Sequence, residues 1–292
     1  MIDKLEMFIA LAREQHFGRA AAASHVTQPT LSSAIKALEE QLGVQLVQRG
    51  ARFIGLTPEG QRVLARAKAI VAEARAMKSD VAVAREGLSG TLRLGVIPTA
   101  LASVHDLTRP FLEEHPGVRM RILSLNSHEI LSRLAEFEID AGLSYAQADQ
   151  KQDTLPGFKT LPLYEESYAL VTRADADLPA TLDWADLGGF ELGLLTPDMQ
   201  NRRIIDRNLA KAGIVASPRI ESNSIIALIS HLSERRSATI LPSRTASFYA
   251  LGRDLACIPL TGGLGGIADV AFILPPVGRR TLLLDAFVES LV

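Results

Sequence analysis

The sequence has almost none of the residue chemistry that builds disulfides or metal centres. Cys257 is the one cysteine among 292 residues, so no disulfide can form within the chain, and no cluster of cysteine and histidine has metal-ligand spacing. We interpret Cys257 as a core thiol, and we expect neither a metal ion nor another cofactor.

Long hydrophobic runs and export signals are also lacking. No apolar stretch approaches the roughly 18 residues that a transmembrane helix requires. The first residues, MIDKLEMFIALAREQHF, are amphipathic and partly acidic and contain no small-residue cleavage site of the kind that ends a signal peptide. We therefore expect a cytoplasmic protein with no membrane partner.

Catalytic motifs are missing too. The six histidines are scattered, and the segment GLSYA around Ser144 lacks the second glycine of a nucleophile elbow. The glycine-rich segment from Thr261 to Gly266 resembles a phosphate loop, but an apparent strand follows it where the motif demands a helix. This segment is better explained as a flexible crossover loop, and we do not expect an enzyme.

What is present fits a two-domain globular protein. With 292 residues, 47% hydrophobic and 22% charged, the chain is long enough for two separate cores. Residues 1–89 carry 12 lysines and arginines against 9 acidic residues, whereas the remainder carries 19 against 24. The basic excess therefore lies at the N-terminus, which suits a polyanionic partner.

Three short helices are predicted at the N-terminus. The apolar positions of residues 3–15 recur at the spacing of one helix face, at Leu5, Phe8, Ile9 and Ala12. A second, alanine-rich helix is expected to open after Gly18. The third begins with Thr27 as N-cap and Pro29 in its first turn, and Gly43 is placed to end it in a left-handed conformation.

The third helix has two contrasting faces. Its apolar stripe consists of Leu31, Ile35, Leu38 and Leu42. Its polar side offers small donors and one lysine, as a helix that enters the major groove must. The residues that we expect to contact DNA here are Thr27, Gln28, Pro29, Thr30, Ser32, Ser33 and Lys36. The alternative for this helix alone is an ordinary solvated surface.

The following segment, VQLVQRGARFIGLTPEG, predicts a hairpin-like wing. Gly50 and Gly55 interrupt its alternating pattern, and Arg49 and Arg52 lie at the expected tip, where they can hold phosphate or enter the minor groove. Thr57 and Pro58 are suited to start a new helix. Residues 1–58 are thus predicted to form a winged helix-turn-helix domain that binds double-stranded DNA.

The segment AAAASHVTQPTLSSAIKALEEQLGVQLVQR, followed by LTPEG, resembles the helix-turn-helix and wing of LysR-type transcriptional regulators. The resemblance implies a long linker helix and a two-lobed α/β effector domain with a periplasmic-binding-protein architecture. It also implies self-association as a dimer or tetramer. At Ser33 and Ala34 the family often has a bulkier pair that includes an arginine, so base readout is expected mainly from Gln28, Thr30, Ser32, Lys36 and the wing.

Residues 59–88 read as one long helix. Its apolar positions alternate spacings of four and three, at Val63, Ala67, Ile70, Ala74, Met77, Val81, Ala84 and Leu88. This seam predicts a dimerisation helix, as the resemblance also implies, and the alternative is packing on the chain's own domain. Two DNA-binding domains per dimer would read a promoter site with two-fold symmetry.

Residues 89–292 alternate short apolar strands with helices, which predicts an α/β domain with a largely parallel sheet. The resemblance implies two lobes with a ligand between them. Lobe 1 is expected at about 89–161 and 268–292, and lobe 2 at about 162–267.

Ligands of open α/β folds bind at the carboxyl ends of strands. The polar segments there predict effector contacts at Pro98, Thr99, Ala100, Asn126, Ser127, Thr196, Pro197, Met199, Gln200 and Asn223. Hydroxyls and helix N-termini favour a small anion, most simply a carboxylate, although each of these side chains could instead be an N-cap.

A second, weaker resemblance narrows the effector. The segments LLTPDMQNRRIID and VTQPTLSSAIK are similar to regulators associated with formate dehydrogenase operons, which implies formate. A small-molecule binding module without DNA-binding activity is the alternative function. A solute-binding transport protein is disfavoured by the first 89 residues and by the missing export signal.

Overall fold

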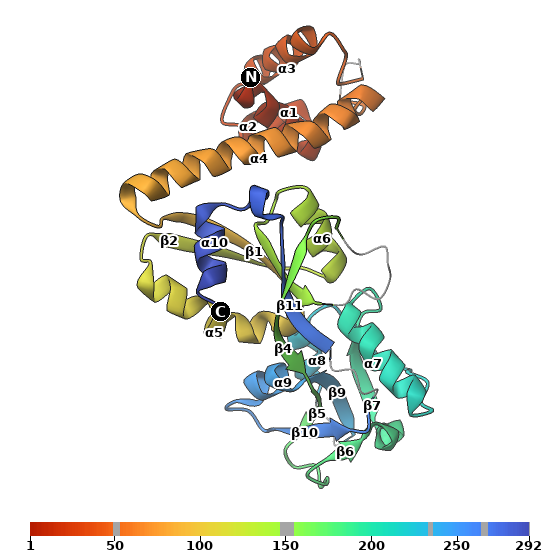
Figure 1. Ribbon diagram of the computed structural model, residues 1–292. Coiled ribbons are helices and arrows are strands. Elements are labelled where there is room, and N and C mark those ends of the chain that lie inside the picture. The colour runs from red at the N-terminus through yellow and green to blue at the C-terminus, as the bar shows by residue number, and fades with distance from the viewer. Residues whose placement is uncertain (49–52, 147–154, 233–235, 264–267, 292) are drawn as a thin grey trace. The chain divides into compact units, whose positions relative to one another are not determined.

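The computed structural model describes residues 1–48, 53–146, 155–232, 236–263 and 268–291. The chain divides into two compact units. Unit 1 comprises Met1–Leu88 with Thr281–Leu283, and unit 2 comprises Ser89–Arg280 with Leu284–Val292. Figure 1 shows the helices of unit 1 in red and orange.

Unit 1 contains four helices within the described residues: α1 (Ile2–Glu14), α2 (Phe17–Ala23), α3 (Gln28–Leu42) and α4 (Pro58–Glu86). The predicted cap of α3 is confirmed, because the Thr27 hydroxyl accepts a hydrogen bond from the Thr30 amide and Gly43 ends the helix at φ 69°. The expectation that α2 opens after Gly18 is wrong. It begins at Phe17 because the His16 side chain, placed before it, accepts a hydrogen bond from the Arg19 amide.

The core of unit 1 joins these helices. Phe8, Leu31 and Leu38 are fully enclosed, as the periodicity predicts. Leu11, outside the predicted stripe, is enclosed as well, whereas Ile9 and Ala12 are only half-buried. Leu42, the last member of the expected α3 stripe, is instead 42% exposed. It belongs to the last turn, directly before the Gly43 cap where the chain leaves the helix.

Helix α4 buries only part of the predicted seam, and it also buries Val71, which lies outside the seam. Ala67 and Val71, one turn apart, are buried in the core of unit 1, and α4 contacts α1. Ile70, Met77 and Val81 are 48%, 60% and 55% exposed. Ala67 therefore packs within its own unit, as the alternative allowed, whereas the middle and end of the seam remain on the surface.

Lobe 1 of unit 2 is built on a five-stranded sheet. Its strands are β1 (Gly90–Val96), β2 (Val118–Ser124), β3 (Ala141–Tyr145), β4 (Lys159–Glu166) and β11 (Ala268–Leu274), in the order β2-β1-β3-β11-β4. Helices α5 (Leu101–Glu114) and α10 (Leu282–Glu289) meet through Phe111 and Phe287, and Phe287 also contacts Phe272 of the sheet. Helix α6 (Ser127–Ala135) packs closely over Gly95 and Gly142 through Ile130. These helices are labelled around the sheet in Figure 1.

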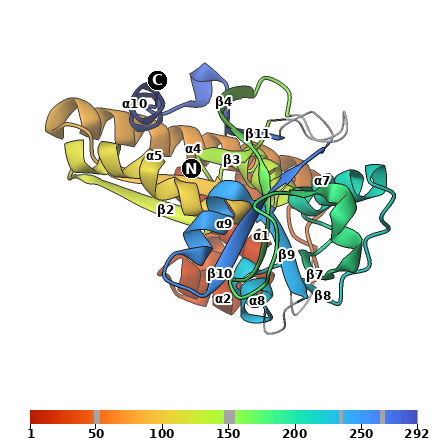
Figure 2. The ribbon, with the colours of Figure 1, turned by 90° about the horizontal axis from the view of Figure 1, so that it is seen from below.

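Lobe 2 has a six-stranded sheet in the order β6-β10-β5-β9-β7-β8. The strands are β5 (Tyr168–Arg173), β6 (Leu182–Asp183), β7 (Glu191–Leu195), β8 (Ile220–Ser222), β9 (Ser237–Pro242) and β10 (Leu255–Thr261). Helix α7 (Gln200–Lys211) packs on β7, while α8 (Ile225–Ser230) and α9 (Ser243–Ala250) share a core with β5 and β9. Figure 2 shows α7 and α9 on opposite sides of these strands.

The expectation of a largely parallel sheet holds for β2-β1-β3 and for β9-β7-β8. It is wrong for β11, which runs antiparallel to β3 and β4, and for β5, which runs antiparallel to β9 and β10. The reason is that the chain crosses between the lobes twice. The first crossover follows Glu166 rather than residue 161, because β4 pairs with β11 of lobe 1.

Among the residues that the structure describes, no helix combines the length and the hydropathy that crossing a bilayer requires.

Candidate DNA-binding surface and effector cleft

Helix α3 presents all seven of its predicted DNA-contacting residues on the surface of unit 1. Thr27, Gln28, Pro29, Thr30, Ser32, Ser33 and Lys36 are exposed. Behind them, Leu31, Ile35 and Leu38 hold the opposite face in the core. The polar face is therefore fixed in direction by packing, while its side chains stay accessible.

Three members of this face are already engaged locally. The Thr27 and Thr30 hydroxyls lie 2.9 Å apart, and Thr27 Oγ1 also accepts from the Thr30 amide at 3.3 Å. Lys36 Nζ lies 3.8 Å from Glu40 Oε1, and the lysine side chain is 78% exposed. Such an exposed pair contributes little energy, so a phosphate oxygen can replace the carboxylate at small cost.

The base of the wing is fastened to α3. Val47 and Leu56 form an antiparallel bridge, and the Gln48 amide donates to the Gly55 carbonyl at 3.0 Å. The Glu39 carboxylate accepts from the Leu46 and Val47 amides at 2.7 and 3.1 Å. Sequence reasoning missed this role of Glu39, and its position one turn before the end of α3 gives no specific signal. The predicted wing arginines, Arg49 and Arg52, lie outside the described residues.

Glycine at position 60 permits the close contact between α4 and the wing. A Cβ added to Gly60 would lie 2.1 Å from the backbone oxygen of Leu46. That oxygen also accepts from the Thr57 amide at 3.0 Å. The start of α4 thus rests directly on the backbone that begins the wing.

In unit 2, a hollow of about 580 Å³ opens between the lobes. We call it the interlobe hollow, and four predicted effector residues line it: Pro98, Asn126, Met199 and Asn223. Glu129 and Asp198 also line it, and none of the described lining residues is a lysine or arginine. This hollow therefore carries negative formal charge.

Asn126 serves as an N-cap as well as a lining residue. Its side-chain oxygen accepts from the Glu129 amide at 2.8 Å, and Glu129 Oε2 accepts from the Asn126 amide at 3.0 Å. This pair is a capping box for α6. Asn126 Nδ2 also donates to Asp198 Oδ2 at 3.4 Å, which links the two lobes across the hollow.

Two other predicted residues, Ser127 and Gln200, line a second, smaller hollow of about 140 Å³. We call it the Arg203 hollow, because Arg203 lines it together with His128, Ser144 and Tyr145. Ser144 Oγ donates to Ser127 Oγ at 3.0 Å. Hydroxyls, an imidazole and a guanidinium thus converge on one small space.

The remaining predicted effector residues line neither hollow. Thr99 and Ala100 are 1% and 0% exposed, and Thr196 and Pro197 follow β7 without facing either space.

Thr99 instead belongs to a buried polar network at the lobe crossover. Tyr145 Oη donates to Glu166 Oε2 at 2.9 Å, accepts from Asn201 Nδ2 at 3.1 Å and lies 3.2 Å from Thr99 Oγ1. Thr245 of lobe 2 donates to the Thr99 backbone oxygen. One tyrosine hydroxyl thereby connects β3, the end of β4, and α7.

Burial controls the protonation of this network. It raises the pKa of Glu166 to about 8, against the opposing effects of the Tyr145 hydrogen bond and of the Arg244 charge. Burial, with the Glu166 charge second, raises the pKa of Tyr145 well above its usual value. Near neutral pH the network therefore holds a protonated carboxyl group.

Sequence reasoning missed Ser144, Tyr145 and Arg203. The first two end β3, whose carboxyl end lies at the same edge of the sheet as that of β1, so the rule that selected Thr99 would also have found them. Arg203 follows the selected segment by three residues and carried no signal of its own.

A helix-turn-helix unit joined to a two-lobed unit with a cleft defines the class of ligand-responsive DNA-binding regulators. Residues 2–61 match the family model described as bacterial regulatory helix-turn-helix protein, lysR family, and residues 85–292 match the LysR substrate binding domain. The chain belongs to the LysR family and is a DNA-binding transcriptional regulator with an effector-binding domain.

Curated relatives are regulators rather than enzymes. A probable hydrogen peroxide-inducible genes activator of Mycobacterium xenopi is 37% identical over 167 residues, covering 57% of this chain and 86% of the relative. The transcriptional dual regulator OxyR of Escherichia coli K12 is 30% identical over 197 residues, covering 66% and 63%. A probable activator of the same kind from Streptomyces viridosporus is 35% identical, and the alignment spans 55% of its length.

Solved structures show the same fold. A full-length OxyR variant from Pseudomonas aeruginosa has a TM-score of 0.75 at 23% identity, covering 100% of this chain and 94% of that one. Full-length CbnR complexed with its target DNA has a TM-score of 0.70 at 24% identity, covering 100% and 98%.

Proposed function

We propose that the polar face of α3 reads double-stranded DNA in the major groove, and that two copies of the chain together read a promoter site with two-fold symmetry. The observation that carries this proposal is the exposed row from Thr27 to Lys36 on a helix whose other face is locked in the core. Gln28, Thr30 and Ser32 supply hydrogen-bonding groups for base edges, and Lys36 supplies a cation for phosphate.

A gel mobility-shift assay with the upstream intergenic DNA of the gene tests this function. We expect a specific complex whose affinity falls steeply with salt, because phosphate contacts release counterions. Equal affinity for unrelated DNA of the same length would remove the specific-reader proposal. The alternative, a small-molecule binding module without DNA-binding activity, predicts no complex at all.

We propose self-association through α4. Ile70, Met77 and Val81 share one side of the helix at spacings of seven and four, and all three are exposed in the single chain. A second copy would cover them. Light scattering of Met77→Glu tests this, with Lys78→Glu as control, and the proposal fails if both variants keep the mass of the wild type. A tetramer would require a further interface.

We propose a small anionic effector, and of the two hollows the Arg203 hollow suits it better. A negative ligand in the interlobe hollow would face Glu129 and Asp198, whereas in the smaller hollow it would meet Arg203 and the Ser127 and Ser144 hydroxyls. The volume of the Arg203 hollow, about 140 Å³, suits a small carboxylate. Formate is the first compound to test.

In this proposal the effector shifts the population of lobe arrangements. Ser127 and Ser144 belong to lobe 1 and Gln200 and Arg203 to lobe 2, so a ligand between them favours the arrangement that brings both sets together. The changed arrangement would alter the spacing of the DNA-binding domains in the oligomer and hence the DNA complex.

A charge-removing variant tests the placement of the anion. We expect Arg203→Met to weaken formate binding at least ten-fold by calorimetry, and Arg207→Met, one turn along the same helix, to leave it unchanged. Equal formate binding by both variants would show that the anion does not bind at Arg203. Absence of binding to the wild type would discard formate and leave the DNA-binding proposal intact.

The relatives named for peroxide-inducible genes suggest another signal, but this sequence does not support a disulfide switch within one chain. Cys257 is its only cysteine. It is half-buried on β10, and desolvation raises its pKa. A thiol with a raised pKa has little thiolate and reacts slowly with peroxide.

A further inference from the structure

One charged residue on the polar face of α3, Glu40, is not among the expected DNA contacts. The outward row of this face repeats at spacings of four, three and four and consists of Pro29, Ser33, Lys36 and Glu40. At 3.6 residues per turn these positions fall within about 60° of one another, and all of them are exposed. Glu40 therefore lies on the same side of α3 as Lys36, opposite the stripe that the core of unit 1 buries.

The two adjacent glutamates of α3 differ in what they contact. Glu39 is half-buried, and its carboxylate accepts hydrogen bonds from the Leu46 and Val47 amides. The Glu40 side chain is 67% exposed, and the contact that the structure describes for it is the pair with Lys36 at 3.8 Å. Because such an exposed pair contributes little to stability, the fold gives no strong reason for a carboxylate at position 40.

A carboxylate on a DNA-facing row has a cost that depends on the base it meets. DNA phosphates repel it, since the charges have the same sign. In the major groove, however, cytosine presents its N4 amino group, from which a glutamate can accept a hydrogen bond, whereas thymine presents its O4 acceptor. A carboxylate therefore favours cytosine and disfavours thymine at the same position.

We propose that Glu40 is a specificity-determining residue that accepts a hydrogen bond from the N4 amino group of a cytosine in the major groove. This inference rests on the proposed DNA-reading function of α3 and adds the base that one residue reads. When DNA binds, Lys36 exchanges Glu40 for a phosphate oxygen, and the released carboxylate meets the base. At a site with thymine in this place the carboxylate faces another acceptor, so the wrong sequence is penalised.

The test is a set of mobility-shift titrations of the full-length chain with its specific intergenic site. Each C·G pair of the half-site is replaced in turn by T·A, symmetrically in both halves. We expect one replacement to weaken wild-type binding at least ten-fold. Glu40→Gln should bind the original and the replaced site within about two-fold of each other, because a glutamine amide can both accept from cytosine N4 and donate to thymine O4.

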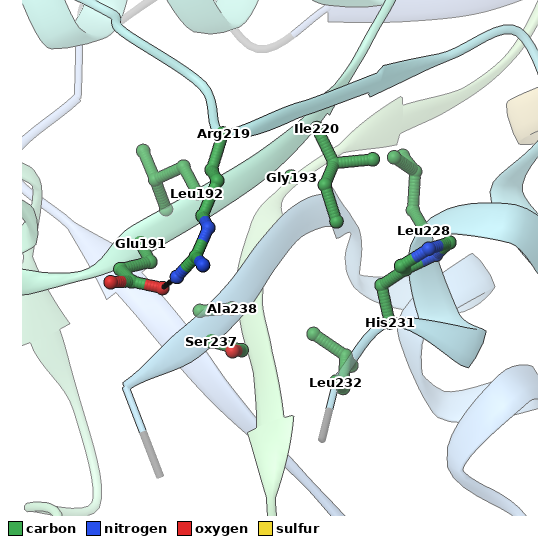
Figure 3. A pocket seen from close by; sticks show the side chains of 10 residues that line it. All are labelled: Glu191, Leu192, Gly193, Arg219, Ile220, Leu228, His231, Leu232, Ser237 and Ala238. Atoms are coloured by element: carbon green, nitrogen blue, oxygen red, sulfur yellow. Dashed lines mark hydrogen bonds and ion pairs between the residues drawn. The ribbon is translucent and has the colours of Figure 1, made fainter. Parts of the chain in front are cut away.

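Two control variants remove one negative charge elsewhere. Glu73→Gln does so at an exposed position of α4 in unit 1. Glu191→Gln does so in lobe 2, where Glu191 is also a partly exposed glutamate paired with a basic side chain, Arg219, as the dashed line in Figure 3 marks. Both controls should keep the wild-type preference for cytosine.

Two results would overturn the inference while the proposed function stands: specific binding by the wild type that no C·G replacement weakens, or the same preference for cytosine in Glu40→Gln as in the wild type. The second result is expected if the pair with Lys36 only stabilises α3, because affinity would then change equally for every sequence. A wild type that forms no specific complex would instead remove the proposed function, and this inference with it.

Discussion

The two units place their polar groups in opposite ways. On α3 the side chains from Thr27 to Lys36 stand exposed over an apolar base. At the lobe crossover of unit 2, Tyr145, Glu166 and Asn201 are buried and hydrogen-bonded to one another. An exposed row can adapt to a large polyanion, whereas a buried network has few alternative arrangements, which suits a two-state response to a small ligand.

The variant with the largest expected effect disturbs unit 1, which carries the exposed polar row. Gly60→Ala drives a methyl group against the Leu46 backbone oxygen, where no rotamer can relieve the clash. We expect a loss of about 3 kcal/mol or more in the stability of unit 1. Hydrogen exchange of residues 28–48 should accelerate, and specific DNA affinity should fall more than a hundred-fold.

Gly55→Ala is the matched control for that variant. A Cβ at Gly55 meets only the Gln48 side chain, at 3.8 Å, so exchange and affinity should stay near those of the wild type. Unchanged exchange in Gly60→Ala would show that the wing is not seated on α4 through this contact.

The next largest effect concerns the buried polar network of unit 2. The folded pKa of Glu166, about 8, lies above its unfolded value near 4.5. The stabilising contribution of its protonated form is therefore fully present below the unfolded pKa and disappears as the pH rises through 8. We expect unit 2 to lose on the order of 3 kcal/mol between pH 5 and pH 9 through this group.

Denaturation at pH 5, 7 and 9 checks this prediction. Glu166→Gln should remove most of the pH dependence, because the amide keeps an acceptor for Tyr145 and cannot ionise. Glu165→Gln, at the exposed neighbouring position, should retain the wild-type dependence. The same pH dependence in all three proteins would mean that Glu166 is not the titrating group.

Local rules were sufficient for the ends of α3 in unit 1 and only partly sufficient for unit 2. The cap at Thr27 and the stop at Gly43 depend on adjacent residues, so the start and end of α3 could be predicted. The end of lobe 1 was predicted at about residue 161, inside β4, because the identity of this strand depends on pairing with β11, about a hundred residues further along the chain. Helix α9, from Ser243 to Ala250, has no local start signal either, since none of its N-terminal side chains caps it.

The effector cleft shows the same limit. Four residues that were selected because they follow strands do line a hollow. Asn126 and Asn223 line the interlobe hollow, and Ser127 and Gln200 line the Arg203 hollow. The positions of the strand ends could not show that Thr99 is buried and contacts Tyr145, because that contact joins residues 46 positions apart in the chain. Nor could they separate an acidic hollow from one that contains an arginine.

The most direct test of the central claim, that α3 is the DNA-reading element, is the salt dependence of specific DNA binding by Lys36→Ala. Loss of one phosphate contact should reduce the slope of log affinity against log salt by about one. Lys78→Ala also removes one positive charge, but from α4, and it should keep the wild-type slope. Identical slopes for Lys36→Ala and the wild type would contradict the account, because Lys36 would then face no phosphate.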